Sequence, residues 1–470
     1  MRKILIFFVC LIFAVIQTTA SEQCSDEVFL RRAYLTITGS LPNTWDAKRF
    51  LDSENTNKRR ALVDRLLKSE LGLKYMQMRW GDILRIKSEF PSNLWPNGVQ
   101  AYNRWVYEHL MNNVPYDKMV RDLLLSYGSN FRSPAVNFYR AFQSRTPENI
   151  YANINLLFLG NRNCTDNGHL CFSQVKYKST KEWKEEIIYI KYSQDLPWER
   201  IVLSDGTVIN LRPNSDWREE YVTWLTSPKN RRFAEVLVNR MWYWVFGKGL
   251  VHEPDDWRED NKPSDPAKLK ELTDYFLAKN FDMRALLKKI LLSDEFNSKS
   301  APEGFYVPQR LPAEVIIDNI ATVTGKWNTY MSRVPEPFTF YPPKTRATHL
   351  GDATVSSSDL ELFGKVSRDV SLESQRNNSI TSRQLLYLMN SSELEKSIRK
   401  SPVIKQYLKK YTDIQSLADI ITLRALARKA TAQEIVMYEE YMKENKLSLN
   451  EFAYDLMWML INSNEFLYNF

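Results

Sequence analysis

The sequence contains few of the side chains that build metal centres and activated nucleophiles. It has four histidines and four cysteines among 470 residues. It has no Gly-x-Ser-x-Gly, His-Glu-x-x-His or Cys-x-x-Cys motif and no phosphate-binding glycine loop. These absences exclude the common signatures of serine hydrolases, zinc peptidases and phosphate-loop NTPases. They also argue against an imidazole-rich metal centre.

Charge of one sign is not concentrated anywhere in the chain. The formal net charge is +8, and basic residues alternate with acidic ones rather than forming runs longer than Lys58-Arg59-Arg60. A nucleic-acid-binding protein usually carries a concentrated basic face. We therefore expect no nucleic-acid partner, whereas an anionic polymer outside the cytoplasm is compatible with this mild basicity.

Long hydrophobic runs are confined to the N-terminus. Arg2 and Lys3 precede an apolar run at residues 4–16, and Ala20 precedes polar residues. This pattern predicts a secretory signal peptide over residues 1–20, because the run is too short to span a bilayer and a small residue suits the peptidase. A retained anchor is the alternative. No later segment is apolar for long enough to cross a membrane, so we expect an exported protein, periplasmic or extracellular, without a transmembrane segment after cleavage.

Helical periodicity dominates the remaining sequence. Between Asp282 and Phe296 the apolar residues recur every three or four positions, and Asp282 is suited to cap the helix. One region differs, because β-branched and aromatic residues gather there and Asp205-Gly206 is a hairpin turn signal. We predict a mainly α fold, in which helical domains at residues 21–175 and 214–470 are joined by a small β-hairpin region at 176–213.

A short motif, Ser-x-Glu-Phe, occurs twice. It spans residues 293–296 and 463–466, each time at the end of a predicted amphipathic helix. No fixed period recurs, so we interpret the second copy of the motif as a common conformation at helix ends rather than as evidence of a repeat architecture. An internal duplication is the alternative.

The densest acidic stretch, HEPDDWREDNKPSDP, runs from His252 to Pro266. Oxygen-rich loops can hold calcium, which takes six to eight oxygen ligands. The candidate cation ligands are Asp255, Asp256, Asp260 and Asp265. A solvated loop with internal salt bridges and a catalytic carboxylate pair are the alternatives, since the spacing matches no recognised calcium loop.

Two cysteines and a histidine gather in the segment NCTDNGHLC, residues 163–171. Covalent haem through Cys-x-x-Cys-His is excluded, because six residues separate Cys164 from Cys171 and His169 precedes the second cysteine. An oxidising compartment favours a Cys164–Cys171 disulfide. Free thiols and a weak zinc site remain open. We expect no cofactor and no bound metal.

Several longer stretches carry a family resemblance. The first half includes VFLRRAYLTITGSLPNTWDAKRFLDS, RWGDILRI and YRAFQSRTPENIYANINLLFLG. It resembles the planctomycete cytochrome-associated domain, domain of unknown function fifteen-forty-nine. The second half includes NRMWYWVFGKGLVHEPDDW, QRLPAEVIIDNIATVTG and the terminal INSNEF. It resembles the usual partner of that domain, domain of unknown function fifteen-fifty-three.

The resemblance implies an exported protein without an established activity. Members are often fused to cytochrome c or carbohydrate-binding modules and are often encoded near sulfatases. Many carry Cys-x-x-Cys-His after the helix that ends here in Phe-Leu-Gly, and this chain lacks that motif. The polar residues shared with the family are Asp216, Arg218, Asn239, Arg240, Asp255, Asp256, Arg310, Glu314, Asp318 and Arg368.

These features favour an exported binding or scaffolding protein of extracytoplasmic polysaccharide processing, with a sulfated glycan as the ligand class. Its partners would be a polysaccharide or other exported proteins. One alternative is a hydrolase or metal-dependent enzyme that uses the shared polar residues. The other is an electron-transfer accessory of a cytochrome system. The hydrolase hypothesis requires those polar side chains to converge on an open pocket rather than to pair inside the helical packing.

Overall fold

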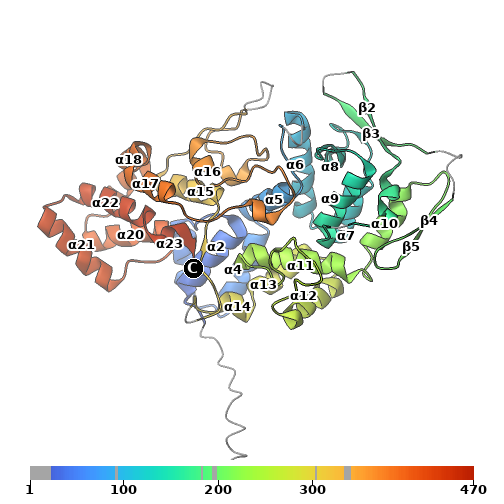
Figure 1. The fold of residues 1–470 in the computed structure, drawn as a ribbon. Helices are drawn as coiled ribbons and strands as arrows, with labels where there is room; N and C mark the ends of the chain where they lie inside the picture. The colour runs from blue at the N-terminus through green and yellow to red at the C-terminus, as the bar shows by residue number, and fades with distance from the viewer. Residues whose placement is uncertain are drawn as a thin grey trace, which may run out of the picture.

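The computed structural model of the protein describes residues 23–89, 94–162, 164–181, 184–192, 198–301, 304–332 and 340–470. The predicted signal peptide lies outside the described residues. The predicted mainly α fold is confirmed, because helices form most of both halves and the strands are short (Figure 1). Among the described residues, no helix is long and apolar enough to cross a membrane.

Helices build the first half. They are α2 (Asp26–Thr38), α3 (Thr44–Leu51), α4 (Lys58–Leu67), α5 (Glu70–Ile83), α6 (Pro96–Met111), α7 (Tyr116–Leu124), α8 (Asn137–Arg140) and α9 (Pro147–Leu159). Side chains placed just before the first turn begin several of them. Ser25, Ser69 and Thr146 each accept a hydrogen bond from a backbone N–H of the first turn, which satisfies a group that would otherwise lack a partner.

Short strands follow the first half, as the sequence predicts, and a further strand lies within that half. A three-stranded antiparallel sheet has the order β1 (Gly128–Ser129), β3 (Glu186–Ile190), β2 (Val175–Ser179). A hairpin pairs β4 (Glu199–Val202) with β5 (Val208–Leu211), and Gly206 takes a φ of 85° in its turn. This conformation suits glycine, so the turn signal at Asp205-Gly206 is confirmed. A 3-10 turn, η2 (Asn167–Phe172), lies between α9 and β2.

The second half is again helical. It contains α10 (Trp217–Leu225), α11 (Arg231–Phe246), α12 (Pro266–Ala278), α13 (Met283–Leu291), α14 (Asp294–Asn297), α15 (Ala313–Thr324), η3 (Ala347–His349), α16 (Ser358–Leu362), η4 (Glu373–Gln375), α17 (Ser382–Asn390), α18 (Ser392–Arg399), α19 (Pro402–Leu408), α20 (Ile414–Leu426), α21 (Ala432–Asn445), α22 (Leu449–Ile461) and α23 (Asn464–Leu467). The strands β6 (Gln309–Arg310) and β7 (Tyr468–Asn469) pair with each other.

The two Ser-x-Glu-Phe motifs have the same local structure. The Ser293 and Ser463 hydroxyls accept from the N–H of Phe296 and Phe466, so each motif starts a new short helix, α14 or α23. The helix predicted over residues 282–296 is therefore interrupted between α13 and α14. Neighbouring arginines of α2 bind the two motifs: Arg32 donates to the Phe296 carbonyl and Arg31 to the Phe466 carbonyl. Similar helix ends thus dock side by side on one central helix.

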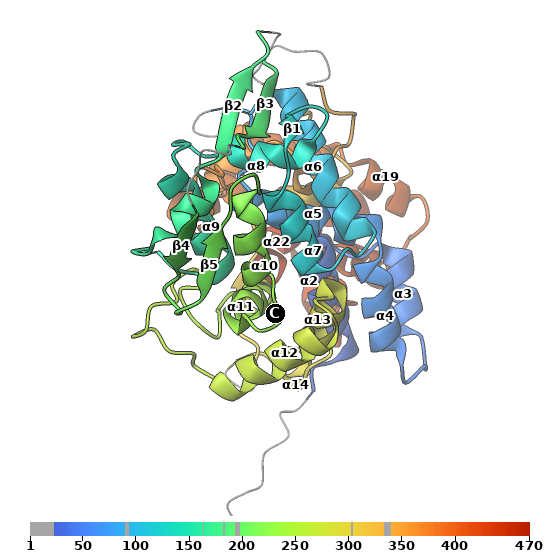
Figure 2. The same ribbon diagram turned by 90° about the vertical axis from the view of Figure 1, so that its right-hand side faces the viewer.

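The two halves share one hydrophobic core. Buried side chains of both belong to a single continuous cluster. Helix α2 packs on α4 and α5 and also on β7, and α3 contacts α20. The strands β2–β5 lie at one end of the molecule and α20–α22 at the other, with α2 between them (Figures 1 and 2). The division into two helical domains at residues 176–213 stays a prediction. The hydrophobic core itself is continuous across that division.

Candidate functional site

Two of the predicted polar residues, Arg368 and Glu314, belong to a buried ion network between the two halves. Arg368 donates to Asp82 of α5 at 2.9 Å. Arg376 reaches the other Asp82 oxygen at 2.7 Å and Glu314 of α15 at 2.8 Å. The guanidinium charges hold the pKa values of Asp82 and Glu314 below their ordinary range against the opposing effect of burial. These carboxylates are paired and are not free to act on a substrate.

A second buried network surrounds Arg240 of α11. Its guanidinium donates to Asp255 at 2.9 Å and to the Leu157 carbonyl at 3.1 Å. The other Asp255 oxygen accepts from the Glu373 N–H at 2.6 Å. Burial and the nearby Asp255 charge raise the pKa of Glu373 to about 7. The Glu373 side chain accepts from the Trp244 indole at 2.8 Å, so it too is enclosed by packing.

The Asp216–Arg218 pair closes the end of α7. Asp216 caps α10 and contacts the Arg218 guanidinium at 2.8 Å. Arg218 is fully buried and donates to the carbonyls of residues 124, 125 and 126. A guanidinium at a helix C-terminus satisfies carbonyls that have no helical partner. Asn239 likewise exchanges hydrogen bonds with Val251 at 2.9 Å in each direction. These residues hold the fold together.

Asp318 and Arg310 complete the predicted polar cluster. Asp318 accepts from the N–H groups of Ala347 and Thr348 at 2.6 and 3.0 Å, and burial raises its pKa to about 6. Arg310 donates to the Phe363 carbonyl at 3.0 Å, and burial lowers its pKa to about 10. The predicted residues therefore do not converge on one pocket. They pair in separate places within the helical packing.

The four predicted cation ligands are also kept apart by their contacts. Asp255 is buried against Arg240, whereas Asp256 pairs with Arg258 at 2.9 Å. Asp260 is exposed, and Asp265 caps α12 by accepting from the Lys268 N–H. Among the described residues, no three His, Cys, Asp or Glu side chains stand close enough to hold a metal ion. These four candidate ligands therefore do not meet at one point.

The predicted Cys164–Cys171 disulfide is wrong, because both residues are free thiols. The turn η2 follows Asp166, which accepts from the Tyr151 hydroxyl at 2.6 Å and the Gly168 N–H at 3.0 Å. Tyr151 fills the space beside Gly168 and fixes this turn. Cys171 is thereby buried in the core, away from half-buried Cys164. Burial raises the pKa values of both thiols, to about 11 for Cys164, so both are protonated at neutral pH.

A polar cleft of about 540 Å³ lies between α5, α6 and residues 340–352. Its lining includes Lys74 and Gln77 of α5 together with Asn103, Arg104 and Tyr107 of α6. Tyr341, His349, Gly351 and Asp352 close it from the second half of the chain. Clefts of this size with aromatic faces and a few polar groups are the usual form of ligand sites.

Buried residues hold the far wall of this cleft from behind. Arg368 donates to the Gly351 carbonyl at 2.9 Å, and Asp318 binds two backbone N–H groups of η3, just before Gly351. A methyl group on Gly351 would lie 2.3 Å from Asn103 Nδ2, so α6 approaches this wall closely. The predicted residues Asp318 and Arg368 thus position the cleft wall without lining it.

The cleft is lined by two cations, Lys74 and Arg104, and by two carboxylates, Glu108 and Asp352. The Lys74 ammonium lies 4.2 Å from the centre of the Tyr107 ring, and burial lowers its pKa. Arg104 is exposed on the next helix. Asp352 is turned away, because its oxygens accept from the Ser88 N–H at 3.1 Å, the Ser88 hydroxyl at 2.5 Å and the Thr354 N–H at 2.9 Å. The two cations are therefore more accessible than Asp352, whereas Glu108 of α6 is exposed at the cleft as Arg104 is.

His349 adds a neutral polar group to the cleft. Burial, with the positive charges of Arg346 and Lys74, lowers its pKa to about 4. The ring is then uncharged at neutral pH and offers one donor and one acceptor. Its buried Nε2 has no hydrogen-bond partner in the described part of the chain. A buried polar atom of this kind favours a polar ligand group beside it.

The residues of this cleft form only a weak signal in the sequence. Lys74 and Gln77 share one face of α5, while Asn103, Arg104 and Tyr107 follow each other along α6 at helical spacing. Such polar faces ordinarily indicate a solvated surface. The opposite wall begins more than 200 positions later, so no local pattern joins the two sides.

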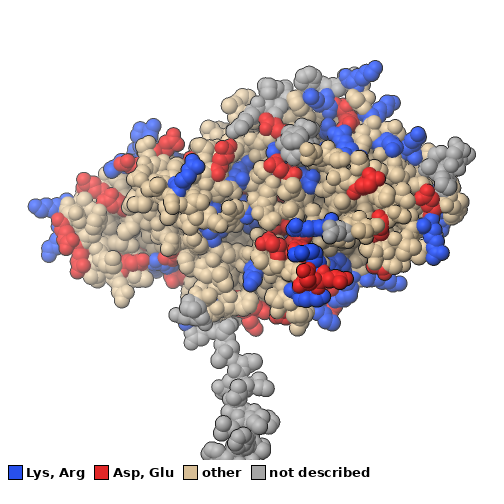
Figure 3. Space-filling view, viewed as in Figure 1, with Lys and Arg blue, Asp and Glu red and all other residues tan. Residues whose placement is uncertain are grey.

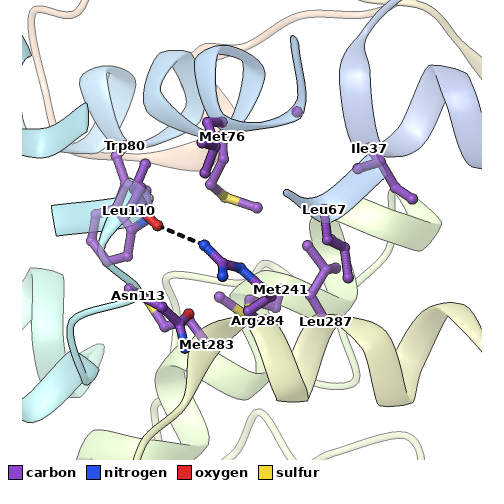
Figure 4. Close-up of a pocket in the computed structure, with 12 residues that line it drawn as sticks. Ile37, Leu67, Met76, Trp80, Leu110, Asn113, Met241, Met283, Arg284 and Leu287 are labelled. Atoms are coloured by element: carbon purple, nitrogen blue, oxygen red, sulfur yellow. Dashed lines mark hydrogen bonds between the residues drawn. The ribbon is translucent and has the colours of Figure 1, made fainter. Parts of the chain in front are cut away.

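A separate, smaller pocket has a different character. It measures about 40 Å³ and is lined by apolar side chains that include Met76, Trp80 and Met241 (Figure 4). Arg284 closes one side by donating to the Leu110 carbonyl at 3.0 Å. A cavity this small and apolar is a packing gap between the halves rather than a ligand site.

The comparisons with known proteins agree with the resemblance seen in the sequence. The family model described as a protein of unknown function, DUF1549, matches residues 11–158. A second model, also described as a protein of unknown function, DUF1553, matches residues 217–442. The chain is a paired DUF1549–DUF1553 protein. Neither a curated protein nor a solved structure matches it.

The cleft lies where the two parts of this DUF1549–DUF1553 protein meet. Helices α5 and α6 belong to the DUF1549 match, and residues 340–352 belong to the DUF1553 match. Ligand sites occur preferentially at such junctions, because each side can contribute groups to one concave surface. Residues 159–216, which carry β2–β5, lie between the two matches.

Proposed function

We propose that this DUF1549–DUF1553 protein is an exported binding protein that holds an anionic saccharide, such as a sulfated sugar, in the junction cleft. The observation that carries the proposal is the pairing of two cations, Lys74 and Arg104, with aromatic rings and amide groups in one cleft. Cations attract sulfate or carboxylate groups, whereas aromatic faces and amides suit the apolar and hydroxyl faces of sugars. In this role the protein acts as a scaffold in polysaccharide processing outside the cytoplasm.

The contacts of the shared polar residues favour binding over hydrolysis. Glu314 and Asp255 each face a guanidinium, and their surroundings are packed. General acid and base catalysis requires carboxyl groups that reach the substrate. The hydrolase hypothesis required these side chains to share an open pocket, and they are distributed between separate buried pairs instead.

The proposal is tested by calorimetric titration of the protein with a sulfated disaccharide and with its unsulfated counterpart. The double variant Lys74→Gln/Arg104→Gln should bind the sulfated sugar at least about tenfold more weakly, which corresponds to about 1.4 kcal/mol. The matched control is Arg60→Gln/Lys68→Gln, which removes the same charges at exposed positions of α4 and its end. The control should bind like the unchanged protein.

Two results would overturn the proposal. One is sulfated-sugar binding that survives removal of both cleft cations. The other is turnover of a sulfated glycan by the purified protein, because a binding protein releases its ligand unchanged.

A further inference from the structure

The outer face of the β1–β3–β2 sheet presents lysines and a tyrosine. In the antiparallel register Lys176 stands opposite Tyr189, and Lys178 opposite Ile187. Directly opposed residues share a face, so Lys176, Lys178 and Tyr189 point the same way. Both lysines are exposed, and Tyr189 is 40% exposed. Val175 and Ile188 point to the other face and are buried. Lys191, just beyond β3, is also exposed.

The β4–β5 hairpin repeats this arrangement. Arg200 stands opposite Asn210 on the exposed face, while Ile201 and Ile209 form the buried one. Trp198, two positions before Arg200, is 69% exposed, with the Arg212 guanidinium 5.8 Å from its ring centre. Large aromatic side chains are usually buried, so an exposed tryptophan beside exposed cations indicates an interaction surface.

Three acidic side chains of the same region are engaged elsewhere, and Glu199 of β4 stands opposite Leu211, on the other face from Arg200. Glu186 pairs with Arg140 at 2.7 Å and with Arg145 at 2.9 Å. Glu185 accepts from the Ser129 hydroxyl at 2.5 Å, and Asp205 accepts within its own turn. Among the described residues, no carboxylate forms an ion pair with the exposed cations of the two outer faces. Lys and Arg side chains are accordingly prominent at the upper right of Figure 3, where β2 and β3 project.

We propose that these outer faces form a docking surface for a long anionic polysaccharide. The surface is defined by Lys176, Lys178, Tyr189, Lys191, Trp198 and Arg200. The cations complement a repeating negative charge, and the exposed aromatic rings suit the faces of sugar rings. The choice of ligand class rests on the proposed function. The surface lies at the end of the molecule that carries β2–β5, outside both family matches, and it does not include the junction cleft.

The test compares a long and a short ligand. Binding of labelled dextran sulfate and of a sulfated disaccharide is measured for the whole protein, with unsulfated dextran as the uncharged reference. The variant Lys176→Glu/Lys178→Glu/Lys191→Glu should bind dextran sulfate at least about tenfold more weakly at low salt and keep its disaccharide affinity. Trp198→Ala/Tyr189→Ala should also weaken polymer binding, without changing the net charge.

The matched control is Lys400→Glu/Lys405→Glu/Lys409→Glu. It makes the same charge change at exposed positions near α18 and α19, in the helical part opposite β2–β5. It should change polymer binding by less than about threefold, because these charges lie at the other end of the molecule from the docking surface. Equal losses in both triple variants, or no loss in the sheet variant, would overturn the docking surface. Polymer binding without disaccharide binding would instead overturn the proposed cleft site and support the docking surface.

Discussion

The guanidinium of Arg368 donates to Asp82 Oδ1 at 2.9 Å and joins residues 286 positions apart. Arg368 also donates to the Gly351 carbonyl in the cleft wall. One buried arginine therefore connects the DUF1549 helices, the DUF1553 segment and the junction between them. The proposed binding site depends on this connection.

Removing Asp82 should destabilise the whole protein. Asp82→Asn leaves two buried guanidinium groups, Arg368 and Arg376, without their shared carboxylate, which typically costs about 3 to 5 kcal/mol. Urea denaturation measures the change. The control Asp369→Asn removes a half-exposed pair with Lys87, for which about 1 kcal/mol or less is expected. Similar losses in the two variants would contradict a structural role for the buried network.

His349 should make stability depend on pH. Its pKa falls from an ordinary value of 6.5 to about 4 in the folded protein. Between these values the unfolded chain binds a proton that the folded protein does not, so stability is lost as pH falls through 6.5 and levels off near 4. The loss approaches about 1.4 kcal/mol per pH unit. The stability difference between the protein and His349→Gln should therefore vary below pH 6.5 and stay constant above pH 7.5. A difference that is constant throughout would contradict a neutral, buried His349.

Filling the space beside Gly351 should weaken ligand binding more than folding. In Gly351→Ala the new methyl group meets Asn103 Nδ2, and this amide must leave its position in the cleft. The expected stability cost is about 1 kcal/mol, because a side chain can move aside. Affinity for the sulfated disaccharide should fall about tenfold. Gly206→Ala is the control: its φ of 85° makes it strained, yet it lies in the β4–β5 turn, so it should lose stability and keep affinity.

Thiol titration should find three free cysteines and little native reactivity. In protein expressed without residues 1–20 and kept free of reductant, unfolding should expose the thiols of Cys24, Cys164 and Cys171. In the folded protein Cys171 should be unreactive because it is buried, and Cys164 slow because its pKa is raised to about 11. A single titratable thiol in the unfolded protein would restore the Cys164–Cys171 disulfide.

Local features of the fold were well predicted from the sequence. The cap at Asp282, the turn at Asp205-Gly206 and the mainly α character follow from patterns within a few residues, because capping, turn geometry and helical periodicity are short-range effects. The disulfide prediction failed for the opposite reason. Spacing and compartment say nothing about Tyr151, a residue of the preceding helix that fixes the η2 turn.

The polar residues selected from the sequence form buried ion pairs and hydrogen bonds in the interior. They do not line the candidate cleft. Arg218, Arg240 and Glu314 became buried partners, and which carboxylate or carbonyl each one meets depends on helix packing across the two halves. Lys74 and Tyr107 could not be recognised as site residues from the sequence, because residues of both types are common on the polar face of an amphipathic helix.

The sequence by itself determined the helical class, the family pairing, and the turn and caps that start and stop individual elements. The tertiary structure alone decided which charged side chains are neutralised by buried partners and which remain accessible to a ligand. Asp82 and Lys74 lie on the same helix, yet packing buries the first between two arginines and leaves the second at the cleft. Burial and distance set the strength of a charge interaction, and both depend on residues that are remote in the chain.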